Sequence, residues 1–139
     1  MKIKFKKMRE NAQVPLRGSD GAAGYDLFAS GAELAFGKIK YLTGVAVEIP
    51  KGYVGLVFPR SSVYRKDLRM SNCVGVIDSD YRGEISAVFD CKEAEGDVYA
   101  IGERCCQLVI VPCLEVEFEE AESLSETERG SNGYGSTGA

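Results

Sequence analysis

The sequence predicts an all-β domain built as a sandwich, barrel or jelly roll, with at most one short helix. Short runs rich in Val, Ile, Phe and Tyr recur along the chain and are separated by Gly, Pro and Asp. Sixteen glycines supply this punctuation, and only the segment SSVYRKDLRM, residues 61–70, has a helical pattern. A length of 139 residues fits one domain, and 45% hydrophobic residues are enough to fill one core.

The first half of the chain contains three predicted strands. Residues 1–8 alternate, with Ile3 and Phe5 on one face and lysines between them, which is typical of a strand. The run YLTGVAVEIP, residues 41–50, predicts a second strand that ends at its proline. The run YVGLVFPR, residues 53–60, predicts a third.

The second half predicts a hairpin and a long last strand. GVID (75–78) and GEISAVF (83–89) flank SDYR, which favours two paired strands joined by a short turn. CCQLVIVPCLEVEF, residues 105–118, predicts the last strand. Beyond Phe118 the chain becomes acidic and then glycine-rich, so we predict a domain over residues 1–120 and a flexible arm over 121–139.

Composition excludes several kinds of chemistry. Histidine is absent, which removes the commonest general base and the commonest zinc ligand. The net charge of −4 argues against a nucleic acid polymer as partner, although a few arginines can still bind a small anion. No segment has the length of a membrane span, and the basic N-terminus lacks the apolar run of a signal peptide. Five cysteines without a CxxC pair predict buried thiols in a reducing compartment, the cytoplasm or the nucleus of a nucleated host.

The glycine-rich arm has the chemistry of a phosphate cradle. In RGSNGYGSTG, residues 129–138, glycines permit backbone conformations in which successive N–H groups converge on an anion. Arg129 suits forked phosphate contacts, Tyr134 can stack on a base, and further donors come from Gly133, Gly135, Ser136 and Thr137. The same composition also describes a plain flexible linker. The order of the arginine, the aromatic residue and the hydroxyls favours a ligand clamp.

Two internal segments offer further polar groups. Asp78 follows an apolar run, where its carboxylate can take a proton from a water molecule aimed at phosphorus. Ordinary turn chemistry is the alternative for any aspartate in such a place. In PRSSV, residues 59–63, Ser61 or Ser62 can cap the short helix that follows. The same hydroxyls beside Arg60 can equally bind phosphate, because capping and anion binding use the same groups.

Five ordered segments resemble the motifs of the trimeric deoxyuridine triphosphatase (dUTPase) family. They are GAAGYDL (21–27), PRSSV (59–63), SNCVGVIDSDYRGEI (71–85), GERCCQLVI (102–110) and RGSNGYGSTG (129–138), and together they span nearly the whole chain. Departures are small: Ser62 stands where many members have glycine, Asn132 replaces a frequent glycine, and Tyr134 replaces a commoner phenylalanine. None of these departures removes a catalytic group.

The resemblance implies a distorted jelly roll that hydrolyses dUTP to dUMP and diphosphate. Such a reaction limits uracil incorporation into DNA and supplies dUMP for dTMP synthesis. The implied assembly is a homotrimer with three shared active sites, in which each arm crosses onto a neighbouring subunit. The implied cofactor is Mg²⁺, carried mainly on the substrate phosphates and reached by Asp26 through a water molecule.

The resemblance also implies a role for each site residue. Asp78 resembles the base that activates the attacking water, and Tyr81 resembles the floor beneath the deoxyribose. The uracil-reading segment would comprise Asn72, Gly75, Val76 and Ile77. Phosphate contacts would come from Arg60, Ser61, Ser62 and Gln107, and the closing lid from Arg129, Gly133, Tyr134, Gly135, Ser136 and Thr137.

Two other functions are open to the same segments. A dCTP deaminase-like enzyme would also bind a pyrimidine nucleotide through an Arg-Ser segment, and ammonia release from dCTP would identify it. A regulatory binding protein would use the scaffold to contact partners, and pull-downs with and without dUTP would identify it. Retention of both Asp78 and the glycine-rich arm favours hydrolysis.

Overall fold

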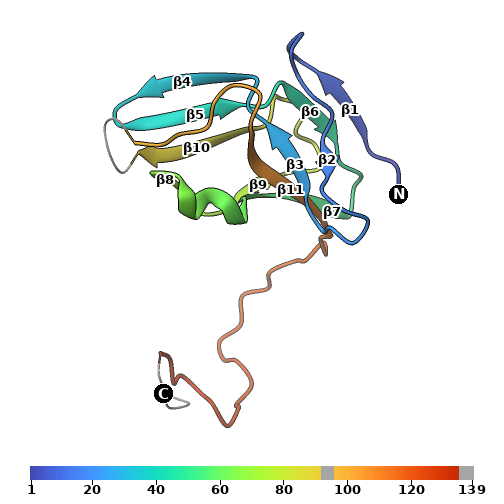
Figure 1. Ribbon diagram of the computed structural model, residues 1–139. Coiled ribbons are helices and arrows are strands. Elements are labelled where there is room, and N and C mark those ends of the chain that lie inside the picture. Colours follow the sequence, from blue (N-terminus) through green and yellow to red (C-terminus); the bar gives the residue numbers. More distant parts are fainter. Residues whose placement is uncertain (92–95, 135–139) are drawn as a thin grey trace.

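A computed structural model describes residues 1–91 and 96–134 of the chain (Figure 1). The predicted all-β fold class is confirmed, since the described residues form eleven strands and one short 3-10 helix. The strands are β1 (Lys4–Lys7), β2 (Leu16–Arg17), β3 (Tyr25–Phe28), β4 (Gly31–Ala35), β5 (Lys38–Leu42), β6 (Val45–Glu48), β7 (Tyr53–Pro59), β8 (Leu68–Met70), β9 (Gly75–Ile77), β10 (Ser86–Cys91) and β11 (Arg104–Pro112). The helix, η1, spans Ser61–Arg65.

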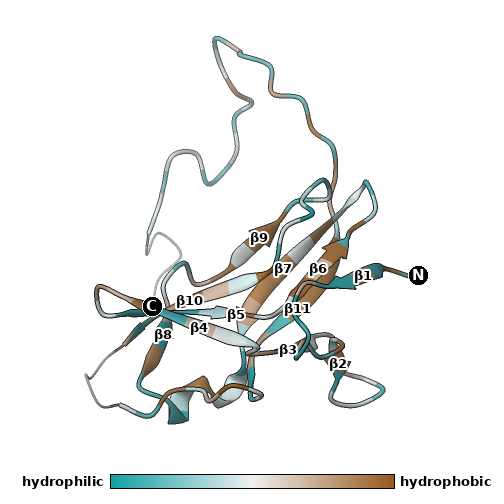
Figure 2. Ribbon diagram, turned by 90° about the horizontal axis from the view of Figure 1, so that it is seen from above, coloured by the Kyte–Doolittle hydropathy of each residue, from teal (hydrophilic) through white to brown (hydrophobic). Residues whose placement is uncertain are grey.

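The strands form three sheets around one core. A five-stranded sheet has the order β2-β3-β11-β7-β9, and a four-stranded sheet has the order β4-β5-β10-β8. The third sheet contains only β1 and β6. Buried side chains of both larger sheets meet in a single cluster, for example Leu27, Val57 and Leu108 from one and Tyr41 and Phe89 from the other. Hydrophobic stretches lie on body strands such as β6 and β7 (Figure 2), as a jelly-roll-like sandwich requires.

The predicted hairpin over residues 75–89 is wrong. β9 pairs with β7 in the five-stranded sheet, whereas β10 pairs with β5 and β8 in the four-stranded sheet. The segment between them therefore carries the chain from one layer to the other. A short turn between two apolar runs favours local pairing only where no longer-range partner competes. Here β9 pairs with β7 and β10 pairs with β5, so the two strands do not pair with each other.

The helical prediction for residues 61–70 is correct only in its first half. Residues 61–65 form η1, but Leu68–Met70 form a strand that pairs with β10. The prediction that Ser61 or Ser62 caps this helix is also wrong, because Arg60 occupies the cap position and makes no side-chain capping hydrogen bond. Burial of Leu68 and Met70 against the core overrides the weak helical pattern.

Other boundaries differ from the predicted ones. The run 41–50 is divided into β5 and β6 at Gly44, whose φ of 70° lies in the left-handed region that favours glycine. Strands β2, β3 and β4 were not predicted, because they are short and lack a strong apolar alternation. The last strand ends at Pro112, and every described residue from 112 to 134 is exposed. Among the described residues no helix is long and apolar enough to cross a membrane.

The cysteine prediction is correct in part. Cys105 and Cys106 are fully buried in β11, and the hydrogen bond with the Cys105 thiol, together with burial, raises the pKa of Cys106. Cys91 is half-buried, whereas Cys73 and Cys113 are exposed. All five thiols are free.

A cluster of three aromatic rings fills the core beneath the segment that follows β7. Tyr41, Phe89 and Tyr99 pack edge to face with ring centroids 5.7 to 5.9 Å apart. The Tyr41 hydroxyl donates to the Tyr99 carbonyl oxygen at 3.0 Å and accepts from the Tyr99 N–H at 3.0 Å. Burial raises the pKa of Tyr99, and the nearby charge of Arg60 opposes that shift. The charge of Arg60 is therefore close enough to Tyr99 to act on its hydroxyl.

The free energy of unfolding is expected to fall at alkaline pH because the buried Tyr41 hydroxyl must lose its proton. Burial raises the pKa of Tyr41 from 10.0 to about 12. The unfolded chain therefore loses this proton before the folded protein does, and the free energy of unfolding falls as the pH rises from about 10 toward 12. Urea denaturation between pH 8 and pH 11.5 measures the fall. Tyr41→Phe should make it shallower and the exposed Tyr64→Phe should not; equal slopes in all three proteins contradict the assignment.

Candidate active site

An aspartate held between two arginines lies at one end of the five-stranded sheet. Asp26 of β3 pairs with Gln107 of β11, which in turn pairs with Phe58 of β7. Arg60 follows β7 directly, and its Nε lies 2.7 Å from Asp26 Oδ1. Arg104 approaches from the start of β11, with Nη1 3.1 Å from Asp26 Oδ2. This arginine–aspartate cluster (Asp26, Arg60, Arg104) places two cations around one largely buried carboxylate.

Arg104 is a site residue that sequence reasoning missed. The pairing of β11 with β3 shifts register between Arg104 and Cys106, and such an irregularity re-aims a side chain. The sequence signal was a cation directly before the predicted last strand and three residues before Gln107. By alternation alone the two would point to opposite faces, so only the register shift explains why both lie near Asp26.

Arg104→Gln is expected to destabilise the fold by about 1 kcal/mol, because it removes a charge-assisted hydrogen bond from a carboxylate shielded from water. The Asp26 side chain is 12% exposed. Lys4→Gln is the matched control, since it breaks an ion pair with Glu48 whose side chains are 83% and 49% exposed and should cost almost nothing. Chemical denaturation measures both; equal losses would show that Arg104 does not stabilise Asp26.

The remaining predicted phosphate contacts lie beside this cluster. The Ser62 hydroxyl accepts from Arg60 Nη1 at 3.2 Å, and Ser61 begins η1 directly after Arg60. The Gln107 side-chain amide donates to the Pro59 carbonyl oxygen at 3.0 Å. Gln107 packs over Gly24, where a Cβ atom would lie 2.4 Å from the Gln107 Oε1. A Cβ atom at position 24 would therefore displace the end of the Gln107 side chain from this position.

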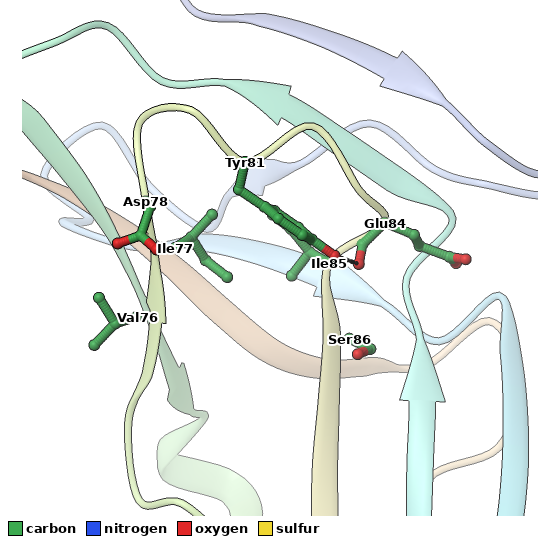
Figure 3. A pocket seen from close by; sticks show the side chains of 7 residues that line it. All are labelled: Val76, Ile77, Asp78, Tyr81, Glu84, Ile85 and Ser86. Carbon is green, nitrogen blue, oxygen red and sulfur yellow. Dashed lines mark hydrogen bonds between the residues drawn. The ribbon is translucent and has the colours of Figure 1, made fainter.

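A small pocket lies at the crossing between the two larger sheets. It contains about 370 Å³ of empty space, part of it open to solvent, and its lining residues are Val76, Ile77, Asp78, Tyr81, Glu84, Ile85 and Ser86. Figure 3 shows the Tyr81 ring reaching across the loop toward Glu84, with Ile77 between the ring and Asp78. Asp78 follows β9 directly, as predicted, and its side chain is exposed.

The loop that carries Tyr81 is fixed at both ends. The Tyr81 hydroxyl donates to the Glu84 carbonyl oxygen at 3.1 Å, and a Cβ atom on Gly83 would lie 2.3 Å from that hydroxyl. The Glu84 carboxylate accepts from Arg9 Nε at 2.9 Å and from the Gly44 N–H at 2.6 Å. Glu84 thus forms an ion pair with Arg9. These contacts hold the tyrosine ring as a preformed wall of the pocket.

The predicted uracil-reading residues lie on an edge strand. Gly75, Val76 and Ile77 make up β9, the last strand in the order of its sheet, and β9 pairs only with β7. Its other edge therefore presents backbone N–H and C=O groups that no described strand uses. Asn72 precedes the strand and is exposed. Main-chain donors and acceptors on this edge can pair with the polar edge of a base.

The pocket and the arginine–aspartate cluster lie at opposite ends of β7. Register pairs Gly55 with Ile77 and Val57 with Gly75, so Asp78 lies level with the start of β7. Arg60 follows the other end of the same strand. An extended strand of that length separates the two positions by about 20 Å. One chain therefore does not bring Asp78 and Arg60 around a single phosphate.

The described part of the arm lies away from both groups. Figure 1 shows residues 113–134 extending from the end of β11 without returning to the body. Arg129 makes a local contact, with its Nε 3.2 Å from the Asn132 carbonyl oxygen, and Gly130 has a φ of 52°. Gly133 and Tyr134 are fully exposed. Gly135, Ser136 and Thr137 lie outside the described residues.

The acidic residues fit a metal carried by a ligand rather than one enclosed by protein. No group of three His, Cys, Asp or Glu side chains converges within the described ranges. Asp26 uses each carboxylate oxygen for one arginine, and each oxygen keeps a further lone pair for a water molecule. Mg²⁺ usually keeps several waters and binds through one or two carboxylates and substrate phosphates, so this arrangement fits Mg²⁺.

An all-β sandwich with an arginine–aspartate cluster, a pocket lined by an aromatic ring and an exposed carboxylate, and a glycine-rich arm has the features of a nucleotide-binding protein. The dUTPase family model matches residues 10–138. The chain therefore belongs to the dUTPase family. A deoxyuridine 5'-triphosphate nucleotidohydrolase of Hydrogenobaculum is 41% identical over 142 residues, covering 99% of each chain. The enzyme of the same name from Escherichia phage T5 is 44% identical and covers 91% of this chain and 92% of its own.

Solved structures agree with the family assignment. A dUTPase variant of Staphylococcus bacteriophage 80alpha, determined with dUpNHpp, has a TM-score of 0.86 at 31% identity and covers 99% of both chains. A dUTPase variant of phage phi11 of S. aureus, described with a structural Mg(II) ion, has a TM-score of 0.76 at 29% identity and covers 88% of this chain and 98% of its own. The jelly-roll-like fold of the family is thus the fold of this chain.

Proposed function

We propose that this chain hydrolyses dUTP to dUMP and diphosphate, and that Asp78 is the catalytic base. The observation that carries the proposal is the pocket in which the Asp78 carboxylate, which no described side chain pairs with, stands beside the ring of Tyr81. The Tyr81 ring offers a flat surface to the deoxyribose and leaves no room for a 2′-hydroxyl. The open edge of β9 supplies backbone groups for uracil, with Asn72 at its start.

In the proposed reaction, Asp78 takes a proton from a water molecule whose oxygen attacks the α-phosphorus. A new bond forms between that oxygen and the α-phosphorus, and the bond from the α-phosphorus to the bridging oxygen breaks. Diphosphate leaves with the electron pair of that bond, and Asp78 later returns its proton to solvent. Alignment and charge neutralisation are the main requirements of such a transfer.

The arginine–aspartate cluster and its neighbours would bind the phosphates. Arg60 presents guanidinium N–H groups, Ser61 and Ser62 present hydroxyls, and Gln107 presents an amide. Asp26 orients Arg60 and would hold Mg²⁺ through a water molecule. Bound Mg²⁺ would neutralise charge on the three phosphates. The arm, with Arg129, Gly133, Tyr134, Gly135, Ser136 and Thr137, would close over the nucleotide and exclude water.

The separation of Asp78 from Arg60 supports a homotrimer with shared active sites. About 20 Å lies between the two positions along β7, whereas a base and a phosphate-binding arginine must meet at one triphosphate. A second subunit that brings its cluster to the first subunit's pocket solves this problem, and rotational symmetry repeats the solution three times.

The free state of all five cysteines supports a reducing compartment, the cytoplasm or a nucleus.

Mixed trimers test the shared site. Asp78→Asn and Arg60→Gln chains should each be nearly inactive alone. Co-expressed in equal amounts, they should regain about a quarter of the wild-type activity, because a quarter of the shared sites draw both intact residues from different chains. Light scattering confirms the trimer in each sample. Trimers that stay inactive on mixing would place the whole site in one chain.

A substrate panel tests the reaction itself. With Mg²⁺, diphosphate release is expected from dUTP and not from dTTP, dCTP or UTP. Release from UTP at a similar rate would show that Tyr81 does not exclude nucleotides with a 2′-hydroxyl. Ammonia release from dCTP would indicate a deaminase, and binding of dUTP without release would indicate a regulatory protein.

A further inference from the structure

The Tyr81 ring is held at two points, its backbone and its hydroxyl. The Tyr81 N–H donates to the Asp78 carbonyl oxygen at 3.2 Å, and the Tyr81 carbonyl oxygen accepts from Arg82 Nη1 at 2.9 Å. At the far end of the ring, the Tyr81 hydroxyl donates to the Glu84 carbonyl oxygen at 3.1 Å (Figure 3). Tyr81 is 44% exposed, so packing covers only part of the side chain. The direction of the ring within the pocket therefore depends on where Glu84 lies.

Glu84 is held in turn by its own carboxylate. Arg9 donates to it through two atoms, with Nε 2.9 Å from Oε1 and Nη2 3.3 Å from Oε2. The Gly44 N–H also donates to Oε1, at 2.6 Å. The Glu84 side chain is 19% exposed, and a forked arginine contact fixes the orientation of a carboxylate better than a single contact does. This pair therefore constrains its residues more than an ordinary surface ion pair does.

Arg9 comes from a segment that is tied to the body of the sandwich. It lies just after β1, and the neighbouring Met8 N–H donates to the Gly44 carbonyl oxygen at 2.7 Å. On the other side of Arg9, the Ala12 side chain packs so closely on Gly44 that a Cβ atom there would lie 2.6 Å from the Ala12 Cβ. Arg9 and Gly44 therefore form one anchor for Glu84.

We infer that Arg9 is a positioning residue for sugar selectivity: by anchoring Glu84, it holds the Tyr81 ring where the ring excludes a 2′-hydroxyl. Arg9 lies outside the five motif segments, and its effect passes through Glu84 to Tyr81 without any contact with the nucleotide. The inference rests on the proposed role of Tyr81 and extends it to the N-terminal segment. Loss of Arg9 would free the tip of the ring to move away from the sugar, because groups are held in a selective geometry only when their supporting contacts are in place.

Arg9→Gln tests this inference through the ratio of kcat/KM for UTP to kcat/KM for dUTP. The ratio should rise about three- to tenfold, the factor expected for loss of one hydrogen-bond constraint, while kcat for dUTP changes little. Single-turnover measurements with enzyme in excess detect a slow UTP reaction. Arg9→Lys should give a smaller rise because it keeps a charged contact, and it carries the comparison if Arg9→Gln does not fold.

Lys7→Gln is the matched control for Arg9→Gln. Lys7 lies two residues earlier, is exposed, and loses the same charge on substitution. No side chain in residues 1–91 or 96–134 forms an ion pair with it. The ratio for Lys7→Gln should therefore equal that of the wild-type protein.

A Tyr81→Phe background separates positioning of the ring from stabilisation of the fold. Phenylalanine keeps the ring but lacks the hydroxyl, so Tyr81→Phe alone should raise the ratio by a similar factor. Adding Arg9→Gln to Tyr81→Phe should raise it no further, because the contact that transmits the effect of Arg9 is already absent. Chemical denaturation of each variant measures any loss of stability, which by itself lowers hydrolysis of both nucleotides equally.

An unchanged ratio in Arg9→Gln, with equal losses for UTP and dUTP, would overturn the inference. Arg9 would then only stabilise the fold, and the proposed hydrolysis would stand. Effects of Arg9→Gln and Tyr81→Phe that multiply in the double variant would also overturn it, because Arg9 would then act by another route. Wild-type protein that hydrolyses UTP as readily as dUTP would refute the proposed role of Tyr81, and the inference with it.

Discussion

Asp78→Asn should lower kcat for dUTP hydrolysis by about 10²- to 10⁴-fold, the usual contribution of a general base. The amide keeps the size of the side chain but accepts no proton from water. Binding of dUTP should change little, because Asp78 is proposed to act on the attacking water rather than on the nucleotide. Diphosphate release measures kcat, and calorimetry with a non-hydrolysable dUTP analogue measures binding.

Asp80→Asn is the matched control for this prediction. Asp80 lies two residues further along the same loop, is exposed like Asp78, and loses the same charge on substitution. It should retain nearly wild-type kcat. A large loss in both variants would indicate a general effect of loop charge. Full activity of Asp78→Asn would show that another residue is the base.

The structure explains why Asp78 is suited to this role. No described residue donates a hydrogen bond to its carboxylate or forms an ion pair with it, whereas Asp26 and Glu84 both bind arginines. The arginines occupy the carboxylate oxygens of Asp26 and Glu84, whereas the carboxylate of Asp78 faces the pocket without such a contact among the described residues. A water molecule in the pocket can therefore reach Asp78 directly.

Local patterns predicted the strands that carry a strong apolar signal. The long runs that became β7 and β11 were recognisable because Val, Ile and Phe are concentrated in them. Strand β3 was missed although it carries Asp26, because four residues with one charge give little alternation. A role for Asp26 was predicted only through a motif resemblance, and its contact with Arg104 was seen only in the structure.

Strand pairing was the part that the sequence could not supply. The segment 75–89 has all the local features of a hairpin, yet its two strands lie in different sheets. The distance between Asp78 and Arg60 follows from that pairing, since it depends on the register of β9 against β7. Residue types indicated which groups can act on a nucleotide. Long-range register places two of those groups far apart within one chain, which supports the proposal that they come from different copies.

Deletion of residues 129–139 should lower kcat/KM by about 10²-fold or more and leave the folded trimer intact. The proposed lid would supply phosphate donors and exclude water, and loss of a single preorganised donor alone can cost about 10²-fold. Stability should not change, since the described part of this segment is exposed and its hydrogen bonds are local, from Arg129 to Asn132 and from Gly130 to Thr127. Steady-state kinetics and thermal denaturation measure the two effects.

Two point variants locate the effect within the arm. Tyr134→Phe should retain activity because the ring can still stack, whereas Tyr134→Ala should lose part of it. A truncated protein that melts earlier or dissociates would show that the arm stabilises the assembly. Unchanged kinetics in a stable trimer would show that the arm is not part of the active site. The donors around Arg60 would then have to bind the triphosphate without a lid.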